Sequence, residues 1–396
     1  MRKLFLALAM TVGMLVGPAS AQDGPLKIGV LGDMSGLWSS SSGKGSIAAV
    51  ELAIEDFGPT VLGRKIEIVS GDHQNKSDLG AAIVRRWFED ENVSMVTDVI
   101  GSAVALAVQG EARRANRIAL YTGAGSSDLT GKECSPTGFV WTLDTHALTL
   151  SVTNALLSQG LKNWYFLTPD FVFGHQAEEV ATKVVEAAGG KVLGSSKFPM
   201  NNQDFSSLLL AAQASKAQVI VMTGGDVAAA MKQAVEFGVV QQGQKLATVL
   251  LWLPLVKGIG TKIGQGTYVT NSFYWDLNDE TRAWSKRYFD KVGAMPTMNH
   301  AGTYSATLHY LQAIQKAGSA DADAVAKAMR EMPVSDATAK GVVRADGLFQ
   351  RDFFLWQIKS PEESTGEWDL LKLVSRIPAE QAALPLAESE CSLVRK

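Results

Sequence analysis

The sequence predicts an α/β fold in which strands alternate with helices of ten to fifteen residues and build parallel sheets. Residues 94–130 show this order most clearly, with an apolar strand at 94–100, a helix at 103–114 and a strand at 117–121. The same alternation begins again near residue 140, which predicts a second domain. About 375 residues remain after a leader segment, a length that also fits two domains.

Every helix predicted in the first domain carries apolar residues on one side, at helical spacing. The first domain is predicted to contain strands at 26–31, 65–70, 94–100 and 117–121 and helices at 47–57, 78–91 and 103–114. The second is predicted to contain helices at 146–159, 176–188, 205–214 and 227–237 and strands at 164–168, 191–195, 219–223, 247–252 and 268–272. Long helices at 280–292, 303–317 and 322–332 and strands at 353–359 and 368–374 complete the chain.

Two turns of small residues follow neighbouring strands, at Gly101-Ser102-Ala103 and at Gly123–Asp128. Two parallel strands joined by a helix place both turns at the carboxyl edge of one sheet, where ligands bind in open α/β proteins. The backbone N–H groups and serine hydroxyls of these turns are neutral donors suited to an anion. Small residues also permit tight turns without binding anything, but two such turns on one edge favour a binding site.

The first residues have the pattern of a secretory signal. Arg2 and Lys3 precede an apolar segment at 4–16, and Ala19-Ser20-Ala21 is a small-x-small cleavage site. No cysteine stands directly after the cleavage site, and no later run of 18 uninterrupted apolar residues occurs that could span a membrane. We therefore expect cleavage after about Ala21 and a soluble protein in a bacterial periplasm.

Charge and motif content exclude several functions. The net charge is −3, with both signs scattered along the chain, which argues against a nucleic-acid partner. No HExxH, GxSxG or phosphate-loop pattern occurs, and Asp72-His73 reads as a polar turn, so we expect no enzyme, cofactor or metal. Cys134 and Cys391 both lie in the exported part, where a disulfide is favoured; two unpaired thiols are the alternative.

An ordered series of segments resembles the periplasmic solute-binding proteins of the branched-chain amino-acid type, and within them the branch that binds aromatic acids. The segments are LKIGVLGDMSG, KIEIVSGDHQNKSDLGAA, VTDVIGS, IALYTGAGSSDLT, TPDFVFGHQ and VIVMTGGD. The resemblance implies a type I, venus-flytrap fold: two lobes, each a parallel sheet flanked by helices, joined by three hinge crossovers. Lobe 1 would comprise 26–142 with 275–350, and lobe 2 would comprise 143–274 with 351–396. The protein would act as a monomer, closing on a small molecule and delivering it to an ABC permease.

The resemblance also implies positions for the ligand contacts. Ser102 corresponds to the serine that follows the VIG segment, and Gly125 to a threonine in the next turn. Phe173 corresponds to an aromatic residue of lobe 2, and Asp226 to a tyrosine after two glycines. With Trp38 and Trp252 as candidate aromatic walls, the expected ligand-binding residues are Trp38, Ser102, Gly123, Ala124, Gly125, Ser126, Phe173, Asp226 and Trp252.

This chain departs from the pattern where an α-amine would bind. The threonine is replaced by Gly125, and the glutamate expected after Leu251 is missing, because no carboxylate lies between Trp252 and Gly260. A buried ammonium without an anionic partner is unfavourable by several kcal/mol. We therefore expect a carboxylate ligand without an α-amine, an aromatic or phenylpropenoid acid. The alternatives are a branched-chain amino acid or small amide, a ligand-sensing partner of a signalling receptor and, third, an enzyme.

Each candidate residue also has an ordinary structural role. Ser102 and Asp226 stand where helices begin and would serve as helix caps. Ser126 would serve as a turn or cap residue, and Phe173 and Trp252 as packing residues of a core. Trp38 lies in a serine- and glycine-rich loop without core periodicity, which favours a role at a cleft.

Overall fold

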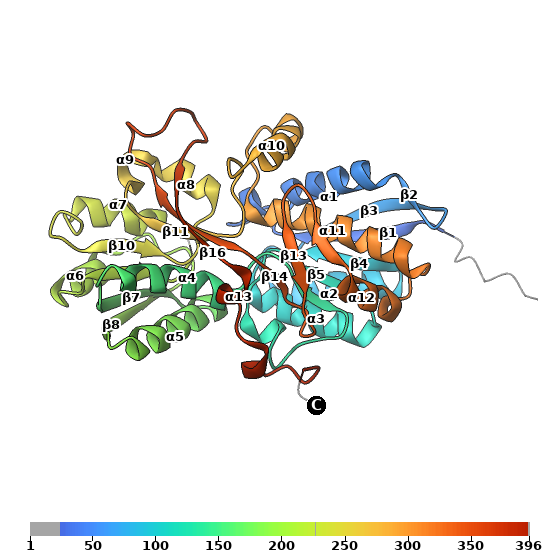
Figure 1. The fold of residues 1–396 in the computed structure, drawn as a ribbon, viewed down its shortest axis with the longest axis horizontal. Coiled ribbons are helices and arrows are strands. Elements are labelled where there is room, and N and C mark those ends of the chain that lie inside the picture. Colours follow the sequence, from blue (N-terminus) through green and yellow to red (C-terminus); the bar gives the residue numbers. More distant parts are fainter. Residues whose placement is uncertain (1–23, 226, 395–396) are drawn as a thin grey trace, which may run out of the picture.

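The computed structural model describes residues 24–225 and 227–394, which form two α/β lobes side by side (Figure 1). Lobe 1 contains a six-stranded sheet and lobe 2 a seven-stranded sheet. The two-lobed α/β fold predicted from the sequence is confirmed. The signal peptide expected at 1–21 lies outside the described residues. No helix in the described part of the chain is long and apolar enough to cross a membrane.

The sheet of lobe 1 is parallel except at one edge. Its order is β2-β3-β1-β4-β5-β6, and only β2 pairs antiparallel, with β3. The strands are β1 Leu26–Gly32, β2 Thr60–Val61, β3 Arg64–Asp72, β4 Val93–Asp98, β5 Ile118–Tyr121 and β6 Gly138–Val140. Helices cover both faces, which is why β4 and β5 are buried at every residue.

Two layers of helices cover the sheet of lobe 1. One layer packs α1, α11 and α12 into a common apolar cluster with β1, and α10 lies beside α1. The other layer packs α2 and α3 against the opposite face. The helices are α1 Lys44–Phe57, α2 Ser77–Glu89, α3 Ser102–Ala115, α10 Asp279–Val292, α11 Met298–Ala317 and α12 Ala322–Glu331. A small antiparallel sheet of β12 Pro333–Ser335, β13 Lys340–Val343 and β14 Phe349–Arg351 follows them.

The sheet of lobe 2 combines a parallel part with an antiparallel edge. Its order is β16-β15-β11-β10-β9-β7-β8, in which β15 and β16 pair antiparallel. The strands are β7 Asn163–Pro169, β8 Lys191–Phe198, β9 Val219–Met222, β10 Lys245–Thr248, β11 Tyr268–Asn271, β15 Phe353–Ile358 and β16 Leu371–Ile377. One face packs on α4 Thr145–Ser158 and α5 Val172–Ala187. The other packs on α6 Ser206–Ala214, α7 Ala228–Glu236, α8 Leu253–Ile259 and α9 Thr261–Gly264.

The chain passes between the two sheets three times: between β6 and α4, between β11 and α10, and between β14 and β15. Side chains tie these crossovers together. The Ser272 hydroxyl donates to the Thr142 carbonyl at 3.1 Å, and Arg351 Nη2 donates to the carbonyls of Ser272 at 2.7 Å and Thr338 at 3.0 Å. All three crossovers therefore share one hydrogen-bonded hinge.

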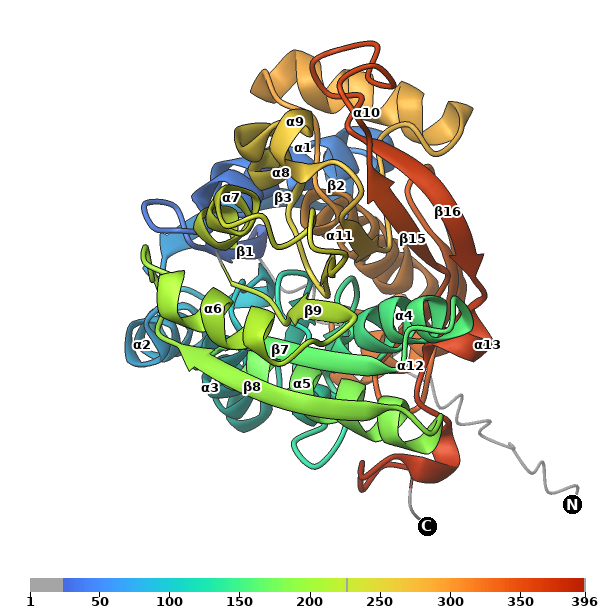
Figure 2. The ribbon, with the colours of Figure 1, turned by 90° about the vertical axis from the view of Figure 1, so that its left-hand side faces the viewer.

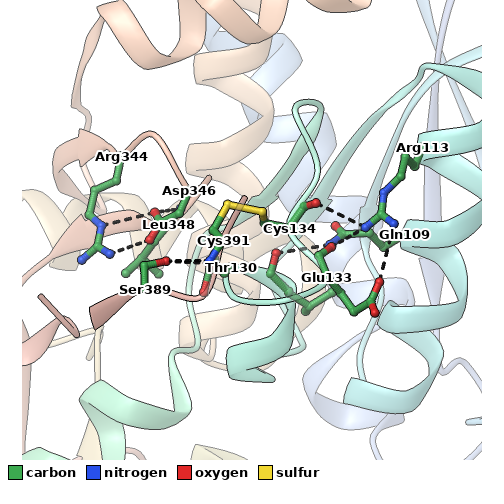
Figure 3. The surroundings of a disulfide bond; sticks show 11 residues. Gln109, Arg113, Thr130, Glu133, Cys134, Arg344, Asp346, Leu348, Ser389 and Cys391 are labelled. Carbon is green, nitrogen blue, oxygen red and sulfur yellow. Dashed lines mark hydrogen bonds and ion pairs between the residues drawn. A yellow bond between two sulfur atoms is a disulfide. The ribbon is translucent and has the colours of Figure 1, made fainter. Parts of the chain in front are cut away.

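The C-terminal tail returns from lobe 2 to lobe 1. After β16 the chain forms α13 Ala379–Ala382, which contacts α4 (Figure 2), and a 3-10 turn at Leu386–Glu388. Cys391 then forms a disulfide with Cys134, 257 residues earlier, in the segment after β5 (Figure 3). Nearby, Arg344 donates to the Leu384 carbonyl at 2.7 Å and pairs with Asp346. The tail is thus fastened covalently to lobe 1.

Several elements differ from the sequence prediction. The sheets are not wholly parallel, because the hairpins β2–β3 and β15–β16 add antiparallel edges. The strand predicted at 94–100 ends at Asp98, since Asp98 and Val99 have left-handed φ angles of 75° and 49°. The strand predicted at 247–252 ends at Thr248 because the chain turns there toward α8. Strands β6 and β12–β14 and helix α8 were not predicted, since they are too short to carry a periodic pattern.

Candidate ligand-binding site

A cavity lies between the two lobes, at the carboxyl ends of their parallel strands. It contains about 390 Å³ of empty space, counted together with the open solvent at its mouth. Its lining residues are Trp38, Ile100, Gly101, Ser102, Gly123, Gly125, Leu143, Phe171, Phe173, Gly225, Leu250 and Trp252. This is the edge on which the sequence placed the two small-residue turns, and Gly101 N–H donates to the Gly123 carbonyl at 3.4 Å.

Trp38 reaches the cavity from the long loop after β1. The Asp33 carboxylate shapes this loop by accepting the backbone N–H groups of Gly36 at 2.8 Å and Trp38 at 3.0 Å. The indole is only 7% exposed and belongs to an apolar cluster that also contains Phe173 and Trp252 of lobe 2. A loop tryptophan is therefore packed between the two lobes, at the wall of the cavity.

The turn after β4 brings Ser102 to the cavity as the first residue of α3. The N-cap residue of α3 is Gly101, with a φ of 95°, and no side chain caps this end of the helix. The hydroxyl of Ser102 has no hydrogen-bond partner among the described residues, although the side chain is buried. Both the hydroxyl and the first N–H groups of α3 are available to a ligand, because those N–H groups have no acceptor within the helix.

The turn after β5 lines the cavity with Gly123 and Gly125. A Cβ on Gly123 would lie 2.8 Å from Ile100 Cα, and one on Gly125 would lie 2.7 Å from Leu143 Cβ, so both close contacts require glycine. Ala124 and Ser126 are buried beside the cavity and do not line it. Ser126 Oγ accepts the Asp128 N–H at 3.3 Å, which is the turn-capping role considered as its alternative. Ligand contact by Ala124 and Ser126 stays a prediction.

Lobe 2 supplies most of the aromatic wall. Phe171 is the N-cap of α5 and Phe173 lies in its first turn, after β7. Trp252 is the N-cap of α8, and Leu250 precedes it in the segment after β10. Asp226, the remaining candidate, lies outside the described residues.

Sequence reasoning missed about half of the lining residues. Phe171 stands two positions before Phe173 at the same strand–helix junction, a signal that could have found it. Leu250 lies in the segment 247–252, for which the sequence predicts a strand. The residues Ile100, Gly101, Leu143 and Gly225 carry no side-chain chemistry that would mark them, and the folding of the segments after the strands brings them to the cavity.

The cavity is apolar, with its polar groups supplied by backbone and hydroxyl. Among its described lining residues none is ionisable. The N-termini of α3 and α5 open onto it from opposite lobes, and neither has a side-chain cap. Uncapped N-termini carry unpaired N–H donors and the positive end of the helix dipole, which together favour an anion.

The two lobes also touch beside the cavity. The Ser127 N–H of lobe 1 donates to Gln176 Oε1 on α5 of lobe 2 at 3.2 Å. This contact and the packing of Trp38 show that the two lobes touch directly beside the cavity. Within residues 24–225 and 227–394, no group of three or more His, Cys, Asp or Glu side chains could hold a metal ion.

Comparison with known proteins gives this arrangement a family. The sequence model of the periplasmic binding protein family matches residues 25–366. The chain belongs to this family. A periplasmic binding protein from Burkholderia mallei is 40% identical, with a TM-score of 0.90 over 93% of this chain and 99% of that one. No curated protein sequence matches the chain.

Two further solved structures extend the comparison. A branched-chain amino-acid ABC transporter periplasmic ligand-binding protein from Burkholderia xenovorans is 39% identical, with a TM-score of 0.87 over 93% of this chain and 100% of that one. A Rhodopseudomonas palustris ABC transporter solute-binding protein, in complex with 3,4-dihydroxybenzoic acid, is 22% identical, with a TM-score of 0.80 over 90% and 98% of the two chains. The chain is thus a periplasmic binding protein of the ABC transporter type, and its family binds ligands for transport.

Proposed function

We propose that this periplasmic binding protein captures a small carboxylate without an α-amine, an aromatic or phenylpropenoid acid, and delivers it to an ABC permease. One observation carries the proposal: the interlobe cavity combines four aromatic side chains and two uncapped helix N-termini with no ionisable group among its described lining residues. The aromatic side chains are Trp38, Phe171, Phe173 and Trp252.

The two helix N-termini at the cavity support the proposal that the ligand is a carboxylate. The first turns of α3 and α5 offer N–H donors from opposite lobes, and the Ser102 hydroxyl adds a neutral donor. A carboxylate held by such donors is stabilised without a cationic side chain. Because the two donor sets lie on different lobes, an anion between them would favour the closed form, which is the form that brings them together.

The surroundings of Trp252 disfavour an α-ammonium. The segment where related proteins carry a glutamate forms helix α8, whose sequence LPLVKGI contains no acid. An ammonium enclosed there would find no anionic partner among the described lining residues, and burying it unpaired is unfavourable by several kcal/mol. Flat aromatic walls instead suit a planar ring, which gains both apolar burial and ring contacts.

A branched-chain amino acid is the second candidate, and the Burkholderia xenovorans relative supports it, since that protein is described as a branched-chain amino-acid binder. The Rhodopseudomonas palustris structure supports the first candidate only as an example of this fold holding an aromatic acid. We favour the first candidate because an amino acid requires an acidic partner for its α-ammonium, and none of the described lining residues is acidic.

We propose closure about the hinge as the working cycle. Lobe 1, 26–142 with 275–350, would hold the ligand first, and lobe 2, 143–274 with 351–396, would then close over it. The protein would act as a monomer in the periplasm, after removal of the signal peptide, and dock in its closed form on the permease. A ligand-sensing role beside a receptor is the alternative use of the same closure.

Calorimetry on protein stripped of ligand tests the proposal. Benzoate, 4-hydroxybenzoate, cinnamate and leucine are titrated into the wild type, and we expect binding by at least one aromatic acid and none by leucine. Ser102→Ala should weaken that binding by about tenfold, the effect of one lost charge-assisted hydrogen bond. Ser158→Ala, which changes an exposed serine on α4, is the matched control and should leave it unchanged. Tight leucine binding with silent aromatic acids would reject the proposal.

A further inference from the structure

Asp98 is the last residue of β4, and it is fully buried without lining the cavity. Asp98 and Val99 both have left-handed backbones, with φ angles of 75° and 49°. L-residues, and β-branched ones above all, rarely adopt this conformation, which persists only where surrounding contacts enforce it. The turn that it creates carries Ile100, Gly101 and Ser102 to the cavity wall.

The Asp98 carboxylate holds a second segment of the site. Oδ2 accepts the Ser42 hydroxyl at 2.7 Å and the Gly43 N–H at 2.8 Å. These residues end the loop that carries Trp38 and lead into α1. Oδ1 accepts Asn299 Nδ2 of α11 at 2.8 Å. The side chain therefore fastens the tryptophan loop to both β4 and α11.

The main chain of Asp98 holds a third segment. Its carbonyl accepts the N–H groups of Gly123 at 2.9 Å and Thr122 at 3.2 Å, in the turn after β5. Gly32 leaves room for this junction, because a Cβ there would lie 2.7 Å from Asp98 Oδ2. One residue thus meets three of the segments that follow strands of lobe 1 and line the cavity, those after β1, β4 and β5.

The charge of Asp98 is held by neutral donors only. Burial raises the pKa of Asp98 to about 6, so the group is charged at neutral pH. Of the ionisable groups near it, burial keeps Tyr288 neutral by raising its pKa, and keeps His300 neutral by lowering its pKa to about 3. Hydrogen bonds to a charged acceptor are the strong ones. An asparagine at position 98 would place its amide N–H₂ group opposite another donor, either the Gly43 N–H or the Asn299 amide, so that one of these hydrogen bonds would be lost.

We propose that Asp98 is a positioning residue for ligand binding: it holds the Trp38 loop, the 100–102 turn and the 123–125 turn in the arrangement that receives the ligand. The proposal rests on the proposed function of the cavity. In this proposal the buried Asp98 carboxylate does not touch the ligand. It sets the geometry of the part of the site that belongs to lobe 1.

Asp98→Asn tests this assignment against Asp346→Asn, which alters another buried aspartate of lobe 1 that pairs with Arg344 away from the cavity. Affinity for benzoate and cinnamate is measured by calorimetry and stability by denaturant unfolding. We expect Asp98→Asn to lose at least about tenfold in affinity. Asp346→Asn should keep wild-type affinity even where it loses more stability. Wild-type affinity in Asp98→Asn, or equal losses in both variants, would overturn the proposal.

Hydrogen exchange adds a readout that does not depend on the ligand. The Gly43 amide donates directly to the carboxylate, so it should exchange faster in Asp98→Asn than in the wild type or Asp346→Asn. If the wild type binds neither acid, the proposed function fails, but the exchange measurement still tests the role of Asp98. Unchanged exchange at the Gly43 amide would refute the positioning role. Should Asp98→Asn fail to fold, Ser42→Ala removes one donor to the carboxylate, together with the acceptor of the Asp33 N–H, and should reduce affinity in the same direction.

Discussion

His300 illustrates how single buried residues set the response of this protein to pH. It lies in the first turn of α11, where Nδ1 accepts the Thr297 N–H at 3.2 Å as part of a capping box. Burial lowers the pKa of His300 to about 3 from an ordinary 6.5. The folded state therefore keeps this ring neutral over a pH range in which the unfolded chain takes up a proton.

We predict that His300→Gln reduces the loss of stability on acidification. Because the folded pKa is depressed, the stabilisation is present above pH 6.5 and is lost as the pH falls toward 3. Between pH 7.5 and pH 5 this loss amounts to about 2 kcal/mol for one such histidine. Glutamine keeps the capping acceptor without titrating. Urea unfolding of both proteins at the two pH values measures the difference.

The pKa of Asp98 is shifted so that its effect on stability has the opposite pH dependence, and this experiment distinguishes it from the effect of His300. Its folded pKa is raised to about 6, so its contribution is present below pH 3.8 and is lost as the pH rises through 6. Since His300→Gln leaves Asp98 in place, the difference between the two proteins isolates the histidine. An equal loss of stability in both would contradict the assignment.

At the scale of elements, the strand–helix junctions decide the shape of the site. Helix α5 starts close to the end of β7 because Gly174 allows it: a Cβ at that position would lie 2.4 Å from the Pro169 carbonyl oxygen. Phe171 and Phe173 on either side of this junction line the cavity. The position of an aromatic wall thus depends on the absence of a side chain at its neighbour.

We predict that Gly174→Ala displaces the start of α5 and lowers both ligand affinity and stability, since the obstructing atom belongs to the backbone and cannot move aside easily. Gly110→Ala on α3 is the matched control, because no atom lies within 4 Å of its Cβ position. Alanine there should stabilise the helix by roughly 0.5–1 kcal/mol. Thermal unfolding and calorimetry compare the two; a neutral Gly174→Ala would show that the junction is not tight.

At the scale of the whole molecule, the C-terminal tail connects the lobes in addition to the three crossovers. It leaves β16 of lobe 2, passes α13 and ends at Cys391, which is bonded to Cys134 of lobe 1. The disulfide closes a loop of 257 residues in sequence separation. Cross-linking positions so far apart removes much of the freedom of the unfolded chain.

We predict that reduction of this disulfide lowers the free energy of unfolding by up to about 5 kcal/mol, the chain-entropy value for a loop of this size. Denaturant unfolding with and without dithiothreitol measures the change. The double variant Cys134→Ser with Cys391→Ser is the control. Its free energy of unfolding should equal that of the reduced wild type and should not change when the reductant is added. The prediction would be contradicted if the unfolding midpoint of the wild type also stayed the same with and without the reductant.

The sequence determined the elements and their class. Alternating apolar strands and amphipathic helices depend on contacts near in the chain, so the parallel core of both sheets and the edge with the two glycine turns were predictable from residues alone. Ser102, Gly123 and Gly125 belong to that edge, whereas Trp38, Phe173 and Trp252 were proposed together with the family resemblance; all six line the cavity.

Only the tertiary structure decided which residues face one another across the lobes. Leu143 and Leu250 carry no local signal, and the sequence left open whether Ser126 caps the turn or binds ligand, whereas the structure shows its Oγ accepting the Asp128 N–H. The central place of Asp98 likewise depends on Ser42 and Asn299, which lie 56 and 201 residues away along the chain. Periodicity reflects how one segment meets solvent and core, whereas a binding site is made by segments that become neighbours only when both lobes have folded and closed.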